Sequence, residues 1–311
     1  MSVAAVQSAR SGGYRRGIVL VLLGALASSW MGLGVRMIDD ATSWQILALR
    51  SFSMMVFLLI IIAWRNPGHL LSTFRQAAGA TLVGGIAIAV AFCGIIVAIQ
   101  STTVANALFL LAAAPFMAAI LGRVFLGEHV RLATWLAIVV SLAGVGVMVA
   151  ENISFGYLWG NVAAAAAALG LAVFLVALRS KPNIEMLPVA AFGGLLGTIA
   201  ALFMCFVVTG VGLSLSLHDV GLSVALGVFQ LGVACYFITV GARYVPAAEV
   251  ALINLVEVVL GPLWVWMAFS ETTGPYTLIG GALVLAAVIG DTLTGERERR
   301  RQIARATPRN L

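Results

Sequence analysis

Residues 114–128 read APFMAAILGRVFLGE, and residues 257–271 read EVVLGPLWVWMAFSE. Both stretches are apolar runs that end on a glutamate, and a shift of 143 residues places Glu128 on Glu271. The same ungapped shift superposes five apolar segments on five others, so we infer that the chain contains two copies of one unit. Further residues matched at this shift are Arg36 with Arg179, Gly84 with Gly227, Val90 with Val233, and Ala105 with Ala248.

The composition indicates an all-α polytopic membrane protein. Of the 311 residues, 62% are hydrophobic and only 10% are charged, and the mean hydropathy is +1.08. A soluble domain carries about a quarter charged residues, because its surface faces water. A helix needs about 20 apolar residues to cross a bilayer core of ~30 Å. The expected transmembrane helices are 17–37, 44–64, 80–100, 103–123, 132–150, 156–178, 187–209, 220–242, 247–269 and 275–293.

The positions of the basic residues predict the orientation in the membrane. If the N-terminus is cytoplasmic, all of the 18 Lys and Arg residues except Arg36 and Arg50 lie in cytoplasmic segments, as the positive-inside rule requires. We therefore expect a multi-pass protein of a bacterial inner membrane with both termini in the cytoplasm. Residues 296–311 form a basic tail that is expected to contact anionic lipid headgroups. A nucleic-acid partner is not expected, because the basic residues are scattered over short loops.

The number of spans in each unit decides how the two units are related. We place the first unit at residues 1–150 and the second at 151–295. Because each unit has five spans, the second unit enters the membrane from the opposite side. Two like folds in opposite orientation are the inverted-repeat plan of secondary transporters, whose substrate site lies near the midplane between the repeats.

Several stretches resemble the drug/metabolite transporter superfamily in its EamA branch. The ending of 114–128 and its repeat in 257–271 look like the family's Pro-to-Gly-Glu ending, and QILALRSF places Arg50 where the family carries an arginine. RYVPAAEVALI, 243–253, is similar to the family's link between spans eight and nine. The resemblance implies two inverted five-helix bundles that export small metabolites, with a size and export role similar to those of the YddG-type amino-acid exporters.

The ninth span departs from that family pattern. Glu257 is followed by Val258 where the family has Glu-Pro, and Pro262 comes four residues later. The span also ends on Ser270 and Glu271 where the family ends on Gly-Glu. These departures bear on the shape of the ninth helix.

Glu257 is the leading candidate for a binding residue, because a carboxylate at the bilayer centre costs about 2.5–3.5 kcal/mol and so faces the protein interior or water. Asn254 and Trp264 share its helix face. Pro262 lacks an amide hydrogen and frees the carbonyl of Val258 beside Glu257. We expect Glu257 and Asn254 to bind the amino group of a substrate. The alternative is a structural glutamate that pairs with an arginine of another helix.

Three further residues are candidates for gating or anchoring. Asn106 and Glu249 are equivalent in the two repeats and lie near opposite membrane faces, where two alternating gates are expected; the alternative is that both cap helix ends. Arg50 is a candidate anchor for a substrate carboxylate. Its alternative is to extend outward to water or to pair with Asp39 or Asp40.

Two aromatic residues and one amide complete the predicted site. Trp30 is expected to contact the substrate side chain, or else to pack in the core or against lipid. Gln230 must hydrogen-bond either to a neighbouring helix or to the substrate. Trp264 is expected either in the pocket or in an aromatic belt at the membrane boundary.

The absence of known motifs narrows the function. The sequence has no Walker A motif, no HExxH and no nucleophile elbow, so neither ATP hydrolysis nor an intramembrane enzyme is expected. We expect no cofactor and no metal. The substrate is expected to be a small molecule, most plausibly an amino acid. A multidrug exporter for cationic aromatic compounds and a scaffold subunit that transports nothing are the alternatives.

Overall fold

The computed structural model describes residues 3–150, 158–269 and 274–306, and this part of the chain is helical with no strand. The described residues contain ten helical segments long and apolar enough to cross a membrane, which confirms the predicted number. We name them spans 1 to 10 in chain order: Gly13–Arg36, Ser43–Arg65, Ala78–Ser101, Val104–Leu126, Leu132–Val149, Leu158–Arg179, Leu187–Val208, Leu217–Gly241, Ala247–Phe269 and Pro275–Arg299.

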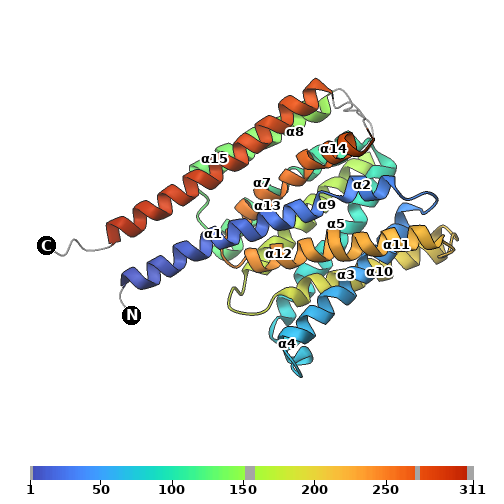
Figure 1. The fold of residues 1–311 in the computed structure, drawn as a ribbon, viewed down its shortest axis with the longest axis horizontal. Coiled ribbons are helices and arrows are strands. Elements are labelled where there is room, and N and C mark those ends of the chain that lie inside the picture. Colours follow the sequence, from blue (N-terminus) through green and yellow to red (C-terminus); the bar gives the residue numbers. More distant parts are fainter. Residues whose placement is uncertain (1–2, 151–157, 270–273, 307–311) are drawn as a thin grey trace.

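Half of the spans are continuous α-helices and the others are interrupted (Figure 1). The continuous ones are α3 (Ser43–Arg65), α5 (Ala78–Ser101), α8 (Leu132–Val149), α9 (Leu158–Arg179) and α15 (Pro275–Ala306). Span 1 consists of α1 (Val3–Ser28) and α2 (Met31–Arg36), span 4 of α6 (Val104–Leu111) and α7 (Ala114–Leu126), and span 9 of α13 (Ala247–Asn254) and α14 (Val256–Phe269). Span 7 joins α10 (Leu187–Phe203) to the π-helix η2 (Met204–Val208), and span 8 joins α11 (Leu217–Ala225), the π-helix η3 (Leu226–Gly232) and α12 (Val233–Gly241). The short helix α4 (Leu70–Gln76) lies between spans 2 and 3.

The first and last helices place both ends of the chain at one end of the bundle. In Figure 1, α1 begins and α15 ends at the same end, and α4 lies at that end of α3. We call this the near end and the opposite one the far end. Because an even number of spans returns the chain to its starting side, the arrangement agrees with ten crossings. Helix α15 continues past the predicted span to Ala306, so the described part of the predicted tail extends span 10 as a helix.

The packing of glycines follows the repeat found in the sequence. A Cβ atom on Gly17 of span 1 would lie 2.6 Å from the Cβ of Tyr244, in the link between spans 8 and 9. The residues equivalent to Gly17 and Tyr244 are Gly160 and Ser101, and a Cβ on Gly160 would lie 2.7 Å from the Ser101 carbonyl carbon. Span 1 of the first unit therefore packs on the second unit as span 6 of the second packs on the first.

The axis between the two units passes near the crossing of spans 2 and 7. Ser51 and Gly194 are equivalent residues, and a Cβ on Gly194 would lie 3.0 Å from the carbonyl oxygen of Ser51. Two residues that exchange under a two-fold rotation and touch each other must lie close to its axis. The structure thus has the two inverted five-helix repeats that the sequence predicts. The proposed boundary at residue 151 and the matched Glu271 lie outside the described residues.

Candidate functional site

Spans 4 and 9 are interrupted at equivalent depths in the two repeats. Helix α6 ends at Leu111 and α7 begins at Ala114, while α13 ends at Asn254 and α14 begins at Val256. The 143-residue shift places Ala112 of the first break on Leu255 of the second. Interrupted helices at membrane depth are tolerated where the backbone is buried in protein or lines a cavity, and transporters place substrates there.

The two breaks have different local causes. In span 4, Pro115 near the start of α7 has no amide hydrogen for the Leu111 carbonyl, which ends the preceding helix. In span 9, Pro262 lies inside α14 and does not interrupt it. The break occurs earlier, where the Val258 amide donates to the Leu255 carbonyl three residues back at 3.1 Å. Pro262, which the sequence singles out, is therefore not the place where span 9 breaks, and no proline or glycine marks that break.

Span 1 is interrupted beside two serines. The Ser28 hydroxyl donates to the Ala25 carbonyl at 3.0 Å, and the Ser29 hydroxyl donates to the Leu26 carbonyl at 2.7 Å. Serine hydroxyls that bond to the preceding turn bend helices, and α1 ends at Ser28. These two adjacent serines are the sequence feature that indicates a break at this point of span 1.

Gln230 connects span 8 to the break in span 1. It lies in the π-helix η3, and its side-chain amide donates to the Ser28 carbonyl at 3.1 Å. The predicted bond to a neighbouring helix is therefore present. The amide oxygen of Gln230 is buried and has no partner among the described residues, so it is also available to a ligand. A π-helical turn within a span is a frequent feature of functional sites.

Trp30 and Trp264 meet at the same break. Their rings stack with centroids 4.9 Å apart and an interplanar angle of 21°. The indole nitrogen of Trp264 donates to the Ser29 hydroxyl at 2.8 Å. Trp264 therefore joins span 9 to span 1, which excludes a purely lipid-facing role in an aromatic belt. Trp30 is 48% exposed, so part of its surface remains open.

Glu257 lies two residues after the break in span 9 and is half-buried. Its carboxylate interacts with the Ser28 hydroxyl and, through space, with the guanidinium of Arg50. The residue thus lies beside the same break that Gln230 and Trp264 contact. These contacts come from four separate spans, so only the folded bundle brings them together.

Arg50 points into the bundle. It is 3% exposed, its guanidinium carbon lies 6.0 Å from the centroid of the Phe92 ring, and it interacts electrostatically with Glu257. The alternative that Arg50 extends to water or pairs with Asp39 or Asp40 is therefore wrong. Its Nε atom is buried without a hydrogen-bond partner among the described residues.

Asn254 supplies a third unpartnered polar atom. It is the last residue of α13, is buried, and its side-chain oxygen has no partner among the described residues. Buried polar groups are normally hydrogen-bonded. The free atoms of Asn254, Gln230 and Arg50 therefore offer two acceptors and one donor to a ligand or to water.

The two predicted gate residues lie at opposite ends of the bundle, away from this site. At the far end, the Asn106 side chain donates to the Thr102 hydroxyl at 3.1 Å and to the Asn161 side-chain oxygen at 3.4 Å. At the near end, Glu249 accepts from the Tyr14 hydroxyl at 2.6 Å and from Arg131 at 3.1 Å. Equivalent positions in the two repeats thus join span 4 to span 6 and span 9 to spans 1 and 5.

Arg131 is the centre of a polar network at the near end that the sequence analysis missed. It pairs with Glu249 and with Asp291 of span 10 at 2.9 Å, and Asp291 also accepts from the Thr134 hydroxyl. Burial opposes the charge of Arg131, but the two carboxylates outweigh it and raise the pKa of Arg131 above its ordinary value. The arginine therefore stays charged and holds spans 5, 9 and 10 together.

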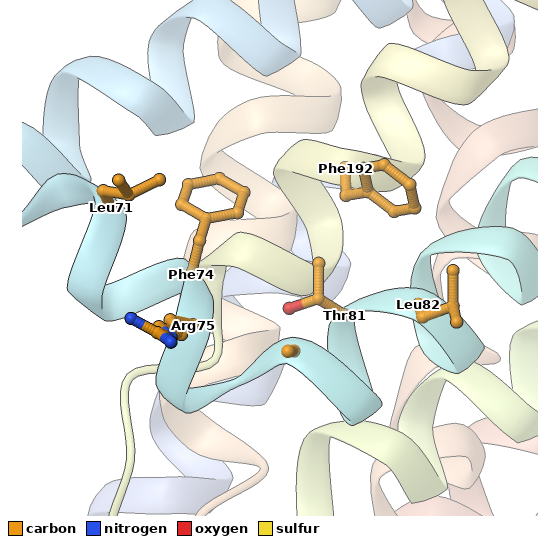
Figure 2. A pocket seen from close by; sticks show the side chains of 7 residues that line it. Leu71, Phe74, Arg75, Thr81, Leu82 and Phe192 are labelled. Carbon is orange, nitrogen blue, oxygen red and sulfur yellow. The ribbon is translucent and has the colours of Figure 1, made fainter.

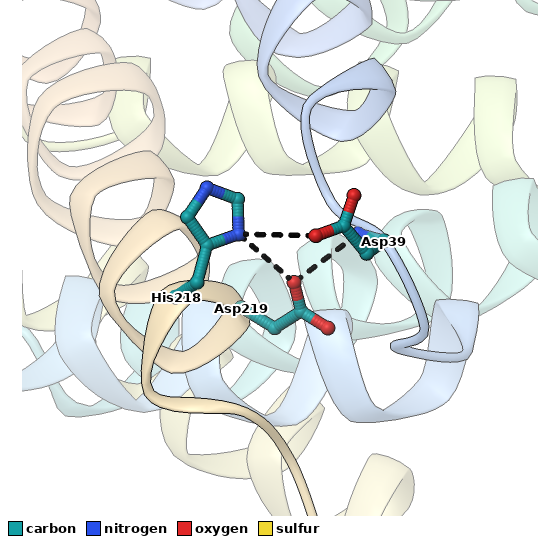
Figure 3. A group of neighbouring side chains, drawn as sticks. All are labelled: Asp39, His218 and Asp219. Atoms are coloured by element: carbon teal, nitrogen blue, oxygen red, sulfur yellow. Dashed lines mark hydrogen bonds and ion pairs between the residues drawn. The ribbon is translucent and has the colours of Figure 1, made fainter.

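A second polar group fastens a loop at the far end (Figure 3). The two carboxylate oxygens of Asp219 each accept a backbone amide, from Asp39 and from Asp40, at 3.1 Å. The His218 ring nitrogen lies 3.4 Å from Asp219 and 3.6 Å from the Asp39 carboxylate. Asp219 is fully buried, so it fixes the link between spans 1 and 2 to the start of span 8.

Comparison with known proteins shows the family to which this chain belongs. Residues 15–150 and 154–291 each match the EamA-like transporter family. An uncharacterized transporter of Archaeoglobus fulgidus is 32% identical over 197 residues, which is 62% of this chain and 69% of that protein. The pseudopaline exporter CntI of Pseudomonas aeruginosa is 28% identical over 277 residues, or 86% of this chain and 94% of that one. A crystal structure with a TM-score of 0.78 and 20% identity, covering 91% of this chain and 98% of that one, shares the fold.

Proposed function

Because the chain belongs to the EamA-like transporter family, we propose that it exports zwitterionic small molecules, above all amino acids, across a bacterial inner membrane. The coarser function, transport of a small molecule by a multi-pass membrane protein, follows from the family and from its ten spans. In our proposal the near end faces the cytoplasm, because the positive-inside rule assigns the basic loops to that side.

The proposed substrate class rests on the charges beside the break in span 1. A zwitterion carries an ammonium and a carboxylate on neighbouring atoms. Glu257 and the free oxygen of Asn254 suit the ammonium, and the buried guanidinium of Arg50 suits the carboxylate. The open face of Trp30 suits an apolar substrate side chain. The single observation that carries this proposal is that buried polar atoms of Arg50 and Asn254 have no hydrogen-bond partner among the described residues.

We propose that the protein works by alternating access, because different contacts close the bundle at its far end and at its near end. The Asn106 contacts join the repeats at the far end, and the Glu249 contacts join them at the near end. In an inverted repeat the two units exchange conformations, so opening one set of contacts accompanies closing the other. Asn106 and Glu249 are then gate residues that hold the helices and do not touch the substrate.

Counterflow in proteoliposomes tests the substrate class. The purified protein is preloaded with unlabelled compound, and entry of a panel of labelled amino acids and quaternary ammonium dyes is followed. We expect saturable exchange of amino acids and none of the dyes, because the Arg50 charge disfavours a permanent cation. Exchange of the dyes without amino acids would favour the multidrug alternative, which the stacked Trp30 and Trp264 rings also fit through cation–π contact.

A further inference from the structure

A separate cavity lies at the near end, away from the proposed transport site. It has a volume of about 480 Å³. Helix α4, the first turns of α5 and one residue of α10 form its walls (Figure 2). Its lining residues are Leu71, Phe74, Arg75, Ala78, Thr81, Leu82 and Phe192.

The position of the cavity matches the boundary between lipid and water. Span 3 begins at Ala78, so Thr81 and Leu82 lie within the membrane while Arg75 lies just outside it. Leu71 and Leu82 are 83% and 55% exposed, and these apolar side chains open the cavity toward the hydrocarbon. A ligand that fits must therefore be apolar at one end and polar at the other.

A polar atom that borders the cavity has no hydrogen-bond partner in the part of the chain that the structure describes. Thr81 is only 7% exposed, yet its hydroxyl oxygen has no hydrogen-bond partner among the described residues. Figure 2 shows this oxygen directed toward the side of the cavity where Phe74 and Arg75 lie. A buried hydroxyl without a partner is uncommon in proteins, and here it faces the space that a ligand would fill.

The charge at the cavity mouth is positive. Arg75 makes no ion pair with any residue in the described ranges. Nearby, the Lys181 amine donates to the Gln76 carbonyl at 3.3 Å. This bond brings a second positive charge to the end of α4, and its acceptor is a neutral carbonyl. Arginine binds phosphate groups through several donors at once, so the chemistry selects an anionic headgroup.

We propose that this cavity binds one anionic phospholipid of the membrane leaflet at the near end. Arg75 binds the phosphate, with Lys181 contributing to the local charge, and Thr81 donates to a headgroup or ester oxygen. Phe74, Leu82 and Phe192 contact the acyl chain. The bound lipid fastens α4 to spans 3 and 7, and the site does not depend on which substrate the protein transports.

Native mass spectrometry of the intact protein tests the site. The purified protein is supplied with either phosphatidylglycerol or phosphatidylcholine, and the lipid molecules that it retains are counted. We expect one retained phosphatidylglycerol and about fivefold fewer retained molecules in Arg75→Gln, since one basic residue contributes about 1 kcal/mol near an anionic surface. Thr81→Val keeps the side-chain volume and is expected to reduce retention as well. Arg123→Gln removes another exposed arginine, on α7, and is expected to retain the lipid.

Four outcomes would overturn the proposal. They are equal retention in Arg75→Gln and the unchanged protein, equal loss in Arg123→Gln, equal retention of phosphatidylcholine, and displacement of the lipid by glycerol phosphate alone. Equal loss in Arg123→Gln would indicate that the lipid is held by the overall positive charge of this end. Equal retention of phosphatidylcholine would indicate an apolar groove that does not recognise the headgroup. Displacement by glycerol phosphate would indicate a site for a soluble phosphate. Each variant is first checked for monodisperse elution, and Arg75→Lys provides a charge-retaining variant if Arg75→Gln fails to fold.

Discussion

Trp264 stacks on Trp30 with the ring centroids 4.9 Å apart, and its indole nitrogen donates to the Ser29 hydroxyl at 2.8 Å. The pair connects span 9 to the break in span 1, beside the proposed substrate site. An aromatic pair contributes about 0.5–1.5 kcal/mol beyond its buried area. The stacked rings therefore make a measurable contribution to the free energy that holds span 9 against span 1.

Substitution of Trp264 separates the stack from the hydrogen bond. Trp264→Phe keeps a ring and loses the bond to Ser29, so we expect a two- to threefold rise in the KM of counterflow, roughly the effect of one neutral hydrogen bond of about 0.5 kcal/mol. Trp264→Ala loses both and is expected to raise the KM about tenfold. Equal effects of Phe and Ala would contradict a role for the stack. Trp266→Phe, on an exposed face of the same helix, is the matched control.

Glu257→Gln tests whether the carboxylate contacts the substrate. Glutamine keeps the shape and loses the charge, and a hydrogen bond to a charged group contributes about 1.5–3 kcal/mol. We expect counterflow of amino acids to fall about 10- to 100-fold. Transport driven by a pH gradient is measured in parallel, because a loss confined to that condition would assign Glu257 to proton coupling. An unchanged rate in both conditions would remove the residue from the mechanism.

Arg50→Gln tests the carboxylate anchor with matched substrates. If the guanidinium binds the substrate carboxylate, the variant loses about tenfold in transport of an amino acid. The corresponding amine, which has no carboxylate, is expected to change less than about twofold. An equal loss for both compounds would show that Arg50 acts only by holding Phe92 and Glu257 in place. Thermal stability of the variant is measured as well, since burial makes a purely structural effect visible there.

The network at the near end predicts a non-additive pair of substitutions. Arg131→Gln leaves Glu249 and Asp291 buried without their cation, and breaking a buried pair costs about 3 kcal/mol. Adding Glu249→Gln removes one stranded charge, so the double variant is expected to melt at a higher temperature than Arg131→Gln alone. If the fall in melting temperature of the double variant equals the sum of the falls in the two single variants, the two residues do not interact and the pairing is wrong.

The pH dependence of this network has a definite sign. The pKa of Arg131 is raised in the folded protein, so the stability that its charge contributes is fully present below the pKa that arginine has in the unfolded chain. That contribution is lost only as the pH rises through the raised folded-state pKa. We therefore expect no loss of thermal stability from Arg131 between pH 6 and 9, measured as the difference between the unchanged protein and Arg131→Lys across that range.

Asp219→Asn tests the fastening of the loop at the far end. Asparagine has one oxygen where aspartate has two, so one of the amides of Asp39 and Asp40 loses its acceptor and the other loses a charged one. We expect hydrogen exchange at these two amides to accelerate about tenfold. His218→Gln, whose ring contacts the same carboxylates at longer distances, is expected to change the exchange less. Unchanged protection in Asp219→Asn would exclude the role assigned to the carboxylate.

The sequence by itself determined the ten spans, the two units and their opposite orientation. Span length and apolar composition are local properties, and the 143-residue repeat is present in the order of the residues. The same reasoning chose Glu257, Gln230 and Trp30, because polar or aromatic side chains within apolar helices need partners. It also identified the equivalence of Asn106 and Glu249, which the structure places at opposite ends of the bundle.

Only the tertiary structure decided where the helices break and what the polar side chains meet. No proline or glycine lies within five residues of Leu255, so we attribute that break to the packing of span 9 on its neighbours. Tyr14 and Glu249 lie 235 residues apart in the chain and bond directly, and the inward-pointing Arg50 lies 6.0 Å from the ring of Phe92 on another span. Contacts of this kind arise from the packing of whole helices, and the periodicity of a single segment carries no information about them.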